Sequence, residues 1–126
     1  MEFKDKQAIY LQIADYVCEE IILKKWPPGE RIPSVRDLAS MLEVNPNTVV
    51  RTYEFLQNKQ IISNKRGIGY SSDENAIERI LAFRRERFME TELPDFFKNL
   101  YLLNISMEEI QAQYDQFIKT LQPLTN

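Results

Sequence analysis

Residues 33–70 read PSVRDLASMLEVNPNTVVRTYEFLQNKQIISNKRGIGY, and the fold follows from this stretch. Its first part has apolar residues at the three-and-four spacing that gives a short helix one apolar side: Val35, Leu38, Ala39 and Leu42. Ser34 precedes them and Asp37 follows three positions later, which is typical of a capped helix start. The pattern therefore predicts a helix from about Ser34 to Leu42.

A second helix is predicted to begin after a link of only three residues. Asn45 can cap it, and Pro46 suits its first position, where the missing N–H of proline has no helical partner. A link of this length sets two helices nearly perpendicular in a helix-turn-helix. The apolar positions that repeat inward are Val49, Tyr53 and Leu56.

The opposite face of this second helix is a candidate surface for reading DNA. The positions that project outward are Asn47, Val50, Arg51 and Glu54, with Thr48 at the edge of the first turn. In a major groove, asparagine can bond bidentately to adenine and arginine to guanine. Hydroxyl and amide groups near a helix start also suit phosphates.

The helical spacing of apolar residues ends after Lys59, and residues 61–63 form a short β-prone run. A turn is predicted within residues 64–69, followed by a second short strand at residues 70–71. Lys65, Arg66 and Gly67 lie in this turn, so the hairpin has a basic tip. Because glycine lets the backbone come close, this tip is expected to approach a phosphate or a minor groove.

With these elements in order, the stretches PPGERIPSVRDLA, VNPNTVVRTYEFL and KRGIGY resemble the winged-helix head of the GntR family of bacterial transcriptional regulators. The NPNTV start and the short chain are similar to the YtrA-like subfamily, and the resemblance covers roughly residues 7–72. It implies DNA contacts at the matching positions: Ser34, Arg36, Asn45, Asn47, Thr48, Arg51, Arg66 and Gly67. It also implies a repressor with a short tail instead of a large effector-binding domain. Glu43 and Gln60 stand where such proteins usually have glycine.

Composition and length set limits on the remaining classes of function. The chain has 126 residues, 44% of them hydrophobic, which is enough for one modest domain with a packed core and an appendage. No apolar run is long enough to cross a bilayer, the N-terminus lacks a secretory signal, and the single Cys18 fits a reducing compartment. We therefore expect a cytoplasmic protein without a membrane segment.

An enzyme is not expected. The chain has no histidine, no base beside its thiol, no glycine-rich phosphate loop and no spaced set of metal ligands. We therefore predict no catalytic residue, no metal site and no cofactor.

Charge is segregated along the chain, although the net charge is only −3. Between Arg31 and Arg66, six cations stand against three anions, a local charge of +3. From Asp73 to the end, six cations stand against ten anions, a local charge of −4. This distribution favours contact between residues 31–66 and DNA. The acidic residues from Asp73 onward limit indiscriminate binding of the protein to DNA.

Helices are also predicted on both sides of the organising stretch. The first runs from Gln7 to about Lys24 and is terminated by residues 26–29. After a polar junction at residues 71–75 the pattern is helical again. Pro94 interrupts it, so a long helix kinked near Leu93 competes with two separate helices, and the kinked helix is slightly favoured. The cations at residues 84, 85 and 87 are interpreted as a solvated face paired with glutamates, with a second DNA contact as the less favoured alternative.

A last helix is predicted after a short turn at residues 104–105. Ser106 and Glu109 form a capping box, and the helix is expected to reach about Gln122, where Pro123 ends it. The predicted fold is therefore mainly α: a winged helix-turn-helix head with a small β-hairpin wing, followed by an antiparallel α-helical hairpin. We predict two domains, a DNA-binding domain at residues 1–72 and a dimerisation tail at residues 73–126.

The tail carries more large apolar residues than a hairpin of its size can hide. A second copy of the chain is the favoured cover, with packing on the head or a small-ligand cage as alternatives. The residues expected at the dimer interface are Leu81, Phe88, Phe96, Phe97, Leu100, Tyr101, Ile110, Tyr114, Phe117 and Leu121.

The sequence thus predicts a DNA-binding transcriptional regulator, a repressor that binds an inverted-repeat operator in double-stranded DNA as a homodimer. A winged helix used as a protein-interaction module, without direct DNA readout, is the alternative. The operator sequence and any small-molecule effector do not follow from the sequence.

Overall fold

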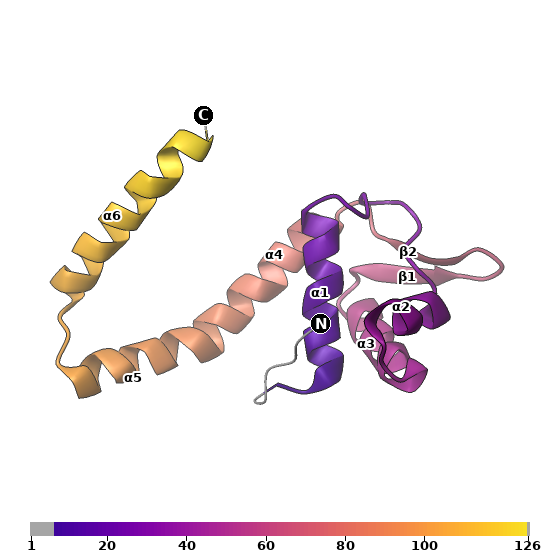
Figure 1. Cartoon of the computed structure of the whole chain (residues 1–126), viewed down its shortest axis with the longest axis horizontal. Helices are drawn as coiled ribbons and strands as arrows, with labels where there is room; N and C mark the ends of the chain where they lie inside the picture. Colours follow the sequence, from indigo (N-terminus) through magenta and orange to yellow (C-terminus); the bar gives the residue numbers. More distant parts are fainter. Residues whose placement is uncertain (1–6, 126) are drawn as a thin grey trace. The chain divides into compact units, whose positions relative to one another are not determined.

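The computed structural model describes residues 7–125, and their side chains up to residue 121. The first six residues of the predicted DNA-binding domain lie outside this range. The chain divides into a head unit that ends at Arg85 and a tail unit that begins at Glu86. The elements in chain order are α1 (Ile9–Ile22), α2 (Val35–Leu42), α3 (Pro46–Asn58), β1 (Ile62–Lys65), β2 (Gly69–Ser72), α4 (Ala76–Arg87), the π-helical turn η1 (Phe88–Glu92), α5 (Leu93–Leu103) and α6 (Met107–Thr125) (Figure 1).

The two helices of the helix-turn-helix begin at the predicted caps. The Ser34 hydroxyl oxygen accepts the Asp37 N–H at 3.1 Å, and α2 starts one residue after this cap. The Asn45 side-chain oxygen accepts the Asn47 N–H at 2.8 Å, and Pro46 occupies the first turn of α3. Each cap satisfies a backbone donor that has no partner within the helix.

Three non-glycine residues in the described part of the head unit have left-handed backbone: Lys24 after the end of α1, Glu43 and Gln60. Glu43, just after α2, has φ +55°, and Gln60, after α3, has φ +60°. These are the two positions where the proteins that the sequence resembles usually carry glycine. The turn geometry is therefore kept, at a steric cost of roughly 1 to 2 kcal/mol for each side chain in this conformation.

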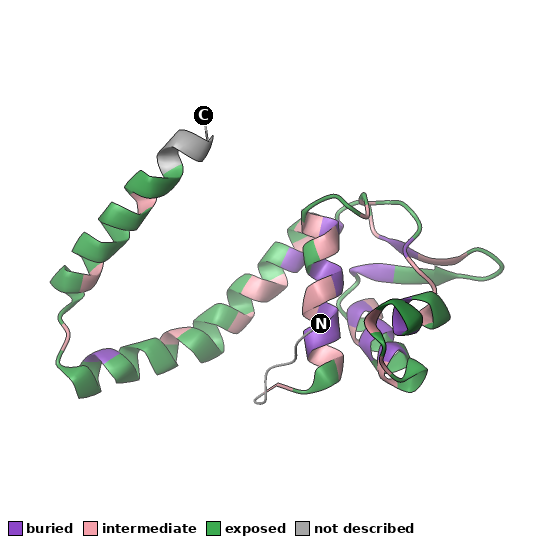
Figure 2. Cartoon of the chain, viewed as in Figure 1, coloured by how far each residue is buried: buried purple, intermediate pink, exposed green. Residues whose placement is uncertain are grey.

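The core of the head unit lies where α1 and α3 pack together, with α2 and the base of the wing closing it (Figure 2). Tyr53 is its largest fully buried side chain, and its hydroxyl donates to the Pro33 carbonyl at 2.7 Å. The core also contains Ala76 and Ile80, so the first turns of α4 belong to the head unit. The predicted inward positions of α3 are all fully buried: Val49, Tyr53 and Leu56.

The wing is an antiparallel hairpin that pairs Ile62 with Ser72 at its base and Lys65 with Gly69 near its tip. Its strands reach further than predicted, and residues 66–68 alone form the turn. Gly67 makes this tight turn feasible, because its φ of +80° is one that glycine adopts without steric cost. Residues 30–32 pair along the other side of β2, where the Ile32 N–H donates to the Tyr70 carbonyl at 3.0 Å.

The helical backbone continues through Pro94. The Leu93 N–H donates to the Phe88 carbonyl five residues earlier, which makes η1 a wide π-helical turn directly before the proline. Proline lacks an N–H and its ring crowds the carbonyl of the preceding turn, so a wider turn relieves this conflict without breaking the helix. The favoured continuous helix is thus found, with its irregularity just before Leu93.

The capping box of the last helix is confirmed. The Glu109 N–H donates to the Ser106 hydroxyl at 3.1 Å, and the Ser106 N–H donates to the Glu109 carboxylate at 3.2 Å. The predicted end at Pro123 is wrong, because the helical backbone runs on to Thr125. A proline in the last turn removes only one hydrogen bond, so the helix passes it before ending.

The tail unit has the two predicted helices and the short turn between them, at Asn104, which takes a left-handed conformation with φ +55°. From this turn α5 and α6 diverge instead of packing along one another (Figure 1). As a result, the described side chains of α6 are exposed or only half-buried (Figure 2).

Candidate nucleic-acid interface

The starts of α2 and α3 present polar and basic groups to solvent. Arg36, Asn45, Asn47 and Arg51 are exposed, and Ser34 and Thr48 are half-buried. Val50 and Glu54, which were also predicted to project outward, are exposed as well. The helix-turn-helix therefore keeps the predicted outward face free of core contacts.

The two capping side chains retain hydrogen-bond donors that the caps do not use. Ser34 and Asn45 each accept a backbone N–H through the side-chain oxygen. The Ser34 hydroxyl hydrogen and the Asn45 amide N–H groups are not consumed by this geometry. Both remain suited to donate to an anion at the helix starts, where the helix dipoles also favour negative charge.

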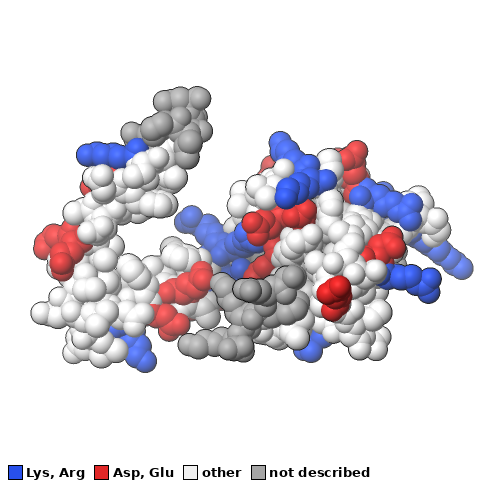
Figure 3. Space-filling view, viewed as in Figure 1, with Lys and Arg blue, Asp and Glu red and all other residues white. Residues whose placement is uncertain are grey.

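The end of the wing is the second basic part of this surface. Lys65 and Arg66 are exposed there, and positively charged side chains project from the wing in Figure 3. Apart from Gly67 and its two chain neighbours, no atom of the described residues lies within 4 Å of the position that a side-chain carbon at Gly67 would occupy. A phosphate can therefore approach the backbone at this turn.

Arg31 is a basic residue beside the wing that was not predicted for the site. Residues 30–32 pair with β2, and this pairing lays Arg31 against the wing. A side-chain carbon at Gly69 would lie 3.5 Å from Arg31 Nη2. The charge of Arg31 had been counted within the basic region, but only the pairing of distant segments brings it to the hairpin.

Tyr10 is the other residue of this surface that the sequence analysis did not assign. It lies in the first turn of α1, and the guanidinium carbon of Arg51 is 3.9 Å from the centre of its ring. The sequence predicts only that Tyr10 lies within the first helix. Its contact with the candidate reading residue depends on how α1 packs on α3.

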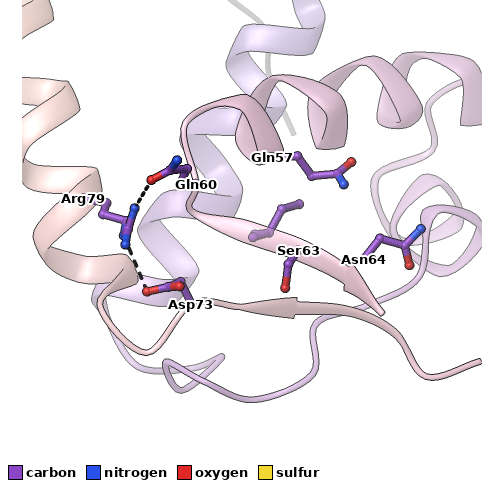
Figure 4. A pocket seen from close by; sticks show the side chains of 7 residues that line it. Gln57, Gln60, Ser63, Asn64, Asp73 and Arg79 are labelled. Carbon is purple, nitrogen blue, oxygen red and sulfur yellow. Dashed lines mark hydrogen bonds and ion pairs between the residues drawn. The ribbon is translucent and has the colours of Figure 1, made fainter. Parts of the chain in front are cut away.

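An open depression lies between the end of α3 and the wing, and Figure 4 shows the residues around it. Arg79 of α4 donates to the Gln60 side chain, and its Nε lies 3.5 Å from an Asp73 carboxylate oxygen. Arg79 thus ties α4 to the end of α3 and to the residue that follows β2. We interpret this cluster as a structural junction. The depression is lined by Gln57, Gln60, Ile62, Ser63, Asn64, Asp73 and Arg79.

The cations of α4 are not simply a solvated face. Arg84 is half-buried, and its Nη2 donates to the Asp15 carbonyl of α1 at 3.2 Å. Arg85 is exposed, as predicted. The prediction is wrong for Arg84 because α4 packs against α1, which brings this guanidinium to a backbone carbonyl.

Most residues predicted for the dimer interface are exposed in the single chain. The exposed ones are Leu81, Phe88, Phe96, Phe97, Tyr101, Tyr114, Phe117 and Leu121. Ile110 is half-buried, and Leu100 is buried, with 8% of its surface exposed. Four further large apolar side chains of the tail unit are exposed: Met89, Leu102, Leu103 and Met107.

The described part of the chain contains no group of three or more histidine, cysteine, aspartate or glutamate side chains that could hold a metal ion. Within the same residues, every helix is too short or too polar to span a membrane.

Comparison with known proteins gives consistent matches. The model of the bacterial regulatory proteins of the gntR family matches residues 9–71. The uncharacterized HTH-type transcriptional regulator YhcF of Bacillus subtilis (strain 168) is 34% identical over 109 residues, which cover 86% of this chain and 88% of YhcF. The HTH-type transcriptional repressor YtrA of the same strain is 41% identical over 68 residues, 54% of this chain and 52% of YtrA.

A solved structure extends the likeness over nearly the whole chain. The crystal structure of a transcriptional regulator assigned to the GntR family from Bacteroides thetaiotaomicron has a TM-score of 0.78 and 46% identity. The likeness covers 90% of this chain and 98% of that one.

Proposed function

Because the chain belongs to the GntR family, and is therefore a helix-turn-helix transcriptional regulator and not an enzyme, we propose that it is a repressor that binds an inverted-repeat operator as a homodimer. Its similarity to YtrA places it among the YtrA-like members of the family. We propose that it acts on the chromosome in the cytoplasm.

The observation that carries this proposal is the exposed basic surface formed by the starts of α2 and α3 together with the wing. A helix start offers free N–H groups and a favourable dipole to phosphate, and the outward face of α3 suits a major groove. A wing with two cations and a glycine at its tip suits the neighbouring backbone or minor groove.

We assign roles to the residues from their chemistry. Asn47 and Arg51, on the outward face of α3, read base edges, since amide and guanidinium groups bond bidentately to adenine and guanine. The groups proposed to hold the DNA backbone at the helix starts are Ser34, Arg36, Asn45 and Thr48. Those proposed to do so in the wing are Lys65, Arg66 and Gly67.

The exposed apolar side chains of the tail unit support the homodimer. Apolar patches of this kind on a soluble protein mark interaction sites, and a second copy supplies an equally apolar surface by symmetry. We propose that residues 73–126 serve dimerisation and residues 1–72 serve DNA binding, although the first turns of α4 pack in the head core. A two-fold dimer matches half-sites about one helical turn, ~34 Å, apart.

Binding to DNA from upstream of the protein's own gene tests the proposal. In a gel-shift or anisotropy titration, Arg51→Ala should weaken operator binding by about 1 to 3 kcal/mol, the usual cost of losing a base contact. Arg36→Ala, which removes a backbone contact, should weaken binding to operator and unrelated DNA alike and lower the salt slope by about one contact. Both side chains are exposed, so the variants should stay folded. Titration over salt should give a slope of roughly −0.9 per phosphate contact.

Arg85→Ala is the matched control, because Arg85 is an exposed arginine of α4 outside the proposed surface. It should bind the operator as the wild type does. Unchanged isotherms for both Arg36→Ala and Arg51→Ala would reject the assigned contacts, and a wild type that binds no specific fragment would reject the function.

A further inference from the structure

We propose that Tyr10 is a positioning residue for DNA readout, whose ring holds the guanidinium of Arg51 in place at the outward face of α3. This inference rests on the proposed function, because it concerns how a candidate reading residue is presented to the operator. It assigns a role in recognition to α1, a helix outside the helix-turn-helix and the wing.

The contact between the two side chains leaves Arg51 able to bind DNA. The guanidinium carbon lies 3.9 Å from the centre of the Tyr10 ring, well within the range of a cation–π contact. Arginine stacks on aromatic rings through its flat face, whereas its N–H donors lie in the guanidinium plane. A stacked contact at this distance uses the face of the guanidinium and leaves free the edge that bonds to a guanine.

Tyr10 is itself fastened to α3, so its ring is a fixed support. The Thr52 hydroxyl, which is fully buried, donates to the Tyr10 carbonyl at 2.8 Å. The Phe55 ring meets the Tyr10 ring edge to face, with centroids 6.2 Å apart and planes at 63°. Three residues of α3 therefore contact Tyr10. Arg51 and Phe55 contact its ring, and Thr52 contacts its backbone carbonyl.

The aromatic contacts continue to α4 within the head unit. The Phe55 ring meets the Phe83 ring at 5.5 Å and 70°, and Lys59 Nζ lies 5.7 Å and 5.1 Å from the centres of these two rings. Phe55 is therefore held from both sides. An edge-to-face chain of this kind limits movement of the Tyr10 ring more than a single contact does.

A fixed support strengthens binding by reducing the freedom that Arg51 loses when it bonds to DNA. A long arginine side chain gives up rotamer freedom on binding, and a side chain already held in place gives up less. An exposed cation–π contact corresponds to about 2- to 5-fold in an equilibrium constant, so removal of the Tyr10 ring should weaken operator binding by about that factor. Binding to unrelated DNA, which depends on phosphate contacts, should not change.

The experiment is a double-mutant cycle on the full-length protein. Operator and unrelated DNA fragments are titrated at one salt concentration with wild type, Tyr10→Phe, Tyr10→Leu, Arg51→Ala, and Tyr10→Leu combined with Arg51→Ala. Tyr10→Phe keeps the ring and should bind as wild type. Tyr10→Leu should lose about 2- to 5-fold for the operator only, and nothing further once Arg51 is alanine.

Three outcomes would overturn the inference. The first is operator binding by Tyr10→Leu that equals that of wild type, the second is a loss that is the same in the Arg51→Ala background, and the third is a parallel fall in binding to unrelated DNA. The second and third would mean that Tyr10 acts through the fold or touches DNA itself. If wild type binds the operator in these cases, the proposed function stands; if wild type binds no operator, both proposals fail.

A measurement on the wild type decides the question if Tyr10→Leu does not fold. The Nε–H of Arg51 should have an NMR order parameter close to the ~0.85 of rigid backbone, whereas a value below about 0.6 would mark a free side chain and overturn the inference. The signal is assigned by its loss in Arg51→Lys. Arg85, an exposed arginine of α4, serves as the reference.

Discussion

A single hydroxyl group links the core of the head unit to the entrance of α2. Tyr53 is fully buried, and its hydroxyl donates to the Pro33 carbonyl at 2.7 Å, just before the Ser34 cap. The interior of α3 thereby fixes the point from which α2 begins. The ring of Tyr53 also packs on Tyr70 of the wing, with centroids 4.7 Å apart. Tyr53, a residue of α3, thus connects this helix to both the start of α2 and the wing.

Tyr53→Phe is predicted to destabilise the protein by about 1 to 2 kcal/mol, because it leaves the Pro33 carbonyl without its donor and adds no new contact. The effect should also depend on pH. Burial, and then the neighbouring Tyr70 and Asp37, raise the pKa of Tyr53 above the ordinary value of 10.0. Above pH 10 the unfolded chain loses this proton while the folded chain keeps it, so the stability of wild type falls as pH rises.

Urea unfolding at about pH 8 and about pH 11 checks both parts of this prediction. Wild type should lose more stability between the two conditions than Tyr53→Phe does, and the gap between the proteins should narrow at the higher pH. Equal losses would show that Tyr53 does not titrate differently in the folded and unfolded states.

The sequence predicted those site residues whose position follows from local spacing. Asn47 and Arg51 face outward because three-and-four spacing fixes the inward side of α3. Tyr10 and Arg31 gain their positions from contacts between distant segments: Thr52 and Tyr10 are 42 positions apart, and Arg31 pairs with Ser71. Nothing in the local pattern of either residue signals such a contact.

At the scale of elements, capping chemistry made the helix starts predictable. Ser34, Asn45 and Ser106 each begin a helix where their hydrogen-bonding groups predict one. Helix ends and irregular turns were less predictable, because proline opposes a helix by an amount that depends on where it lies. The helix continues through Pro94 by way of a π-helical turn, and it passes Pro123 because this proline lies in the last turn. Proline was therefore a poor guide to where these helices end.

Glu43→Gly is predicted to stabilise the head unit. Glycine relieves a steric cost of about 1 to 2 kcal/mol at φ +55°, offset by about 0.4 to 1 kcal/mol because glycine gives the unfolded chain more freedom. The net gain should be roughly 0.5 to 1 kcal/mol in denaturant unfolding. A loss of stability would mean that the Glu43 side chain makes a compensating contribution.

Gln60→Gly is the matched comparison, because Gln60 has nearly the same conformation, with φ +60°, and also accepts a hydrogen bond from Arg79. Removing the Gln60 side chain relieves the same strain but also removes its hydrogen bond with Arg79 of α4. Gln60→Gly should therefore gain clearly less than Glu43→Gly, by about the 0.5 to 1.5 kcal/mol of one hydrogen bond.

At the scale of the molecule, the two units differ in how their apolar residues are used. The head unit has a continuous core that runs from α1 to the first turns of α4. The tail unit leaves most of its large apolar side chains in solvent, from Phe88 in η1 to Leu121 in α6. Exposed apolar side chains in this number are typical of an interaction surface, which supports the proposal of a homodimer.

Phe117→Glu is predicted to separate the dimer without unfolding the head unit. Phe117 is 57% exposed in the single chain, so a charge there is solvated in the monomer but must lose its water in an apolar interface. Dimerisation should weaken by at least about 2 kcal/mol, roughly 30-fold. Operator binding should weaken as well, because a monomer contacts one half-site at a time and loses the gain from binding two half-sites together.

Leu23→Glu is the matched control, because Leu23 is 56% exposed and lies in the head unit, outside both the tail and the proposed DNA surface. Sedimentation velocity over a range of concentrations should give a dimer for wild type and Leu23→Glu, and a monomer for Phe117→Glu. A monomeric wild type, or a Phe117→Glu variant that sediments as wild type does, would remove the tail as the dimer interface. Inverted-repeat recognition would then need another surface to pair the heads, since a lone recognition helix reads only one half-site.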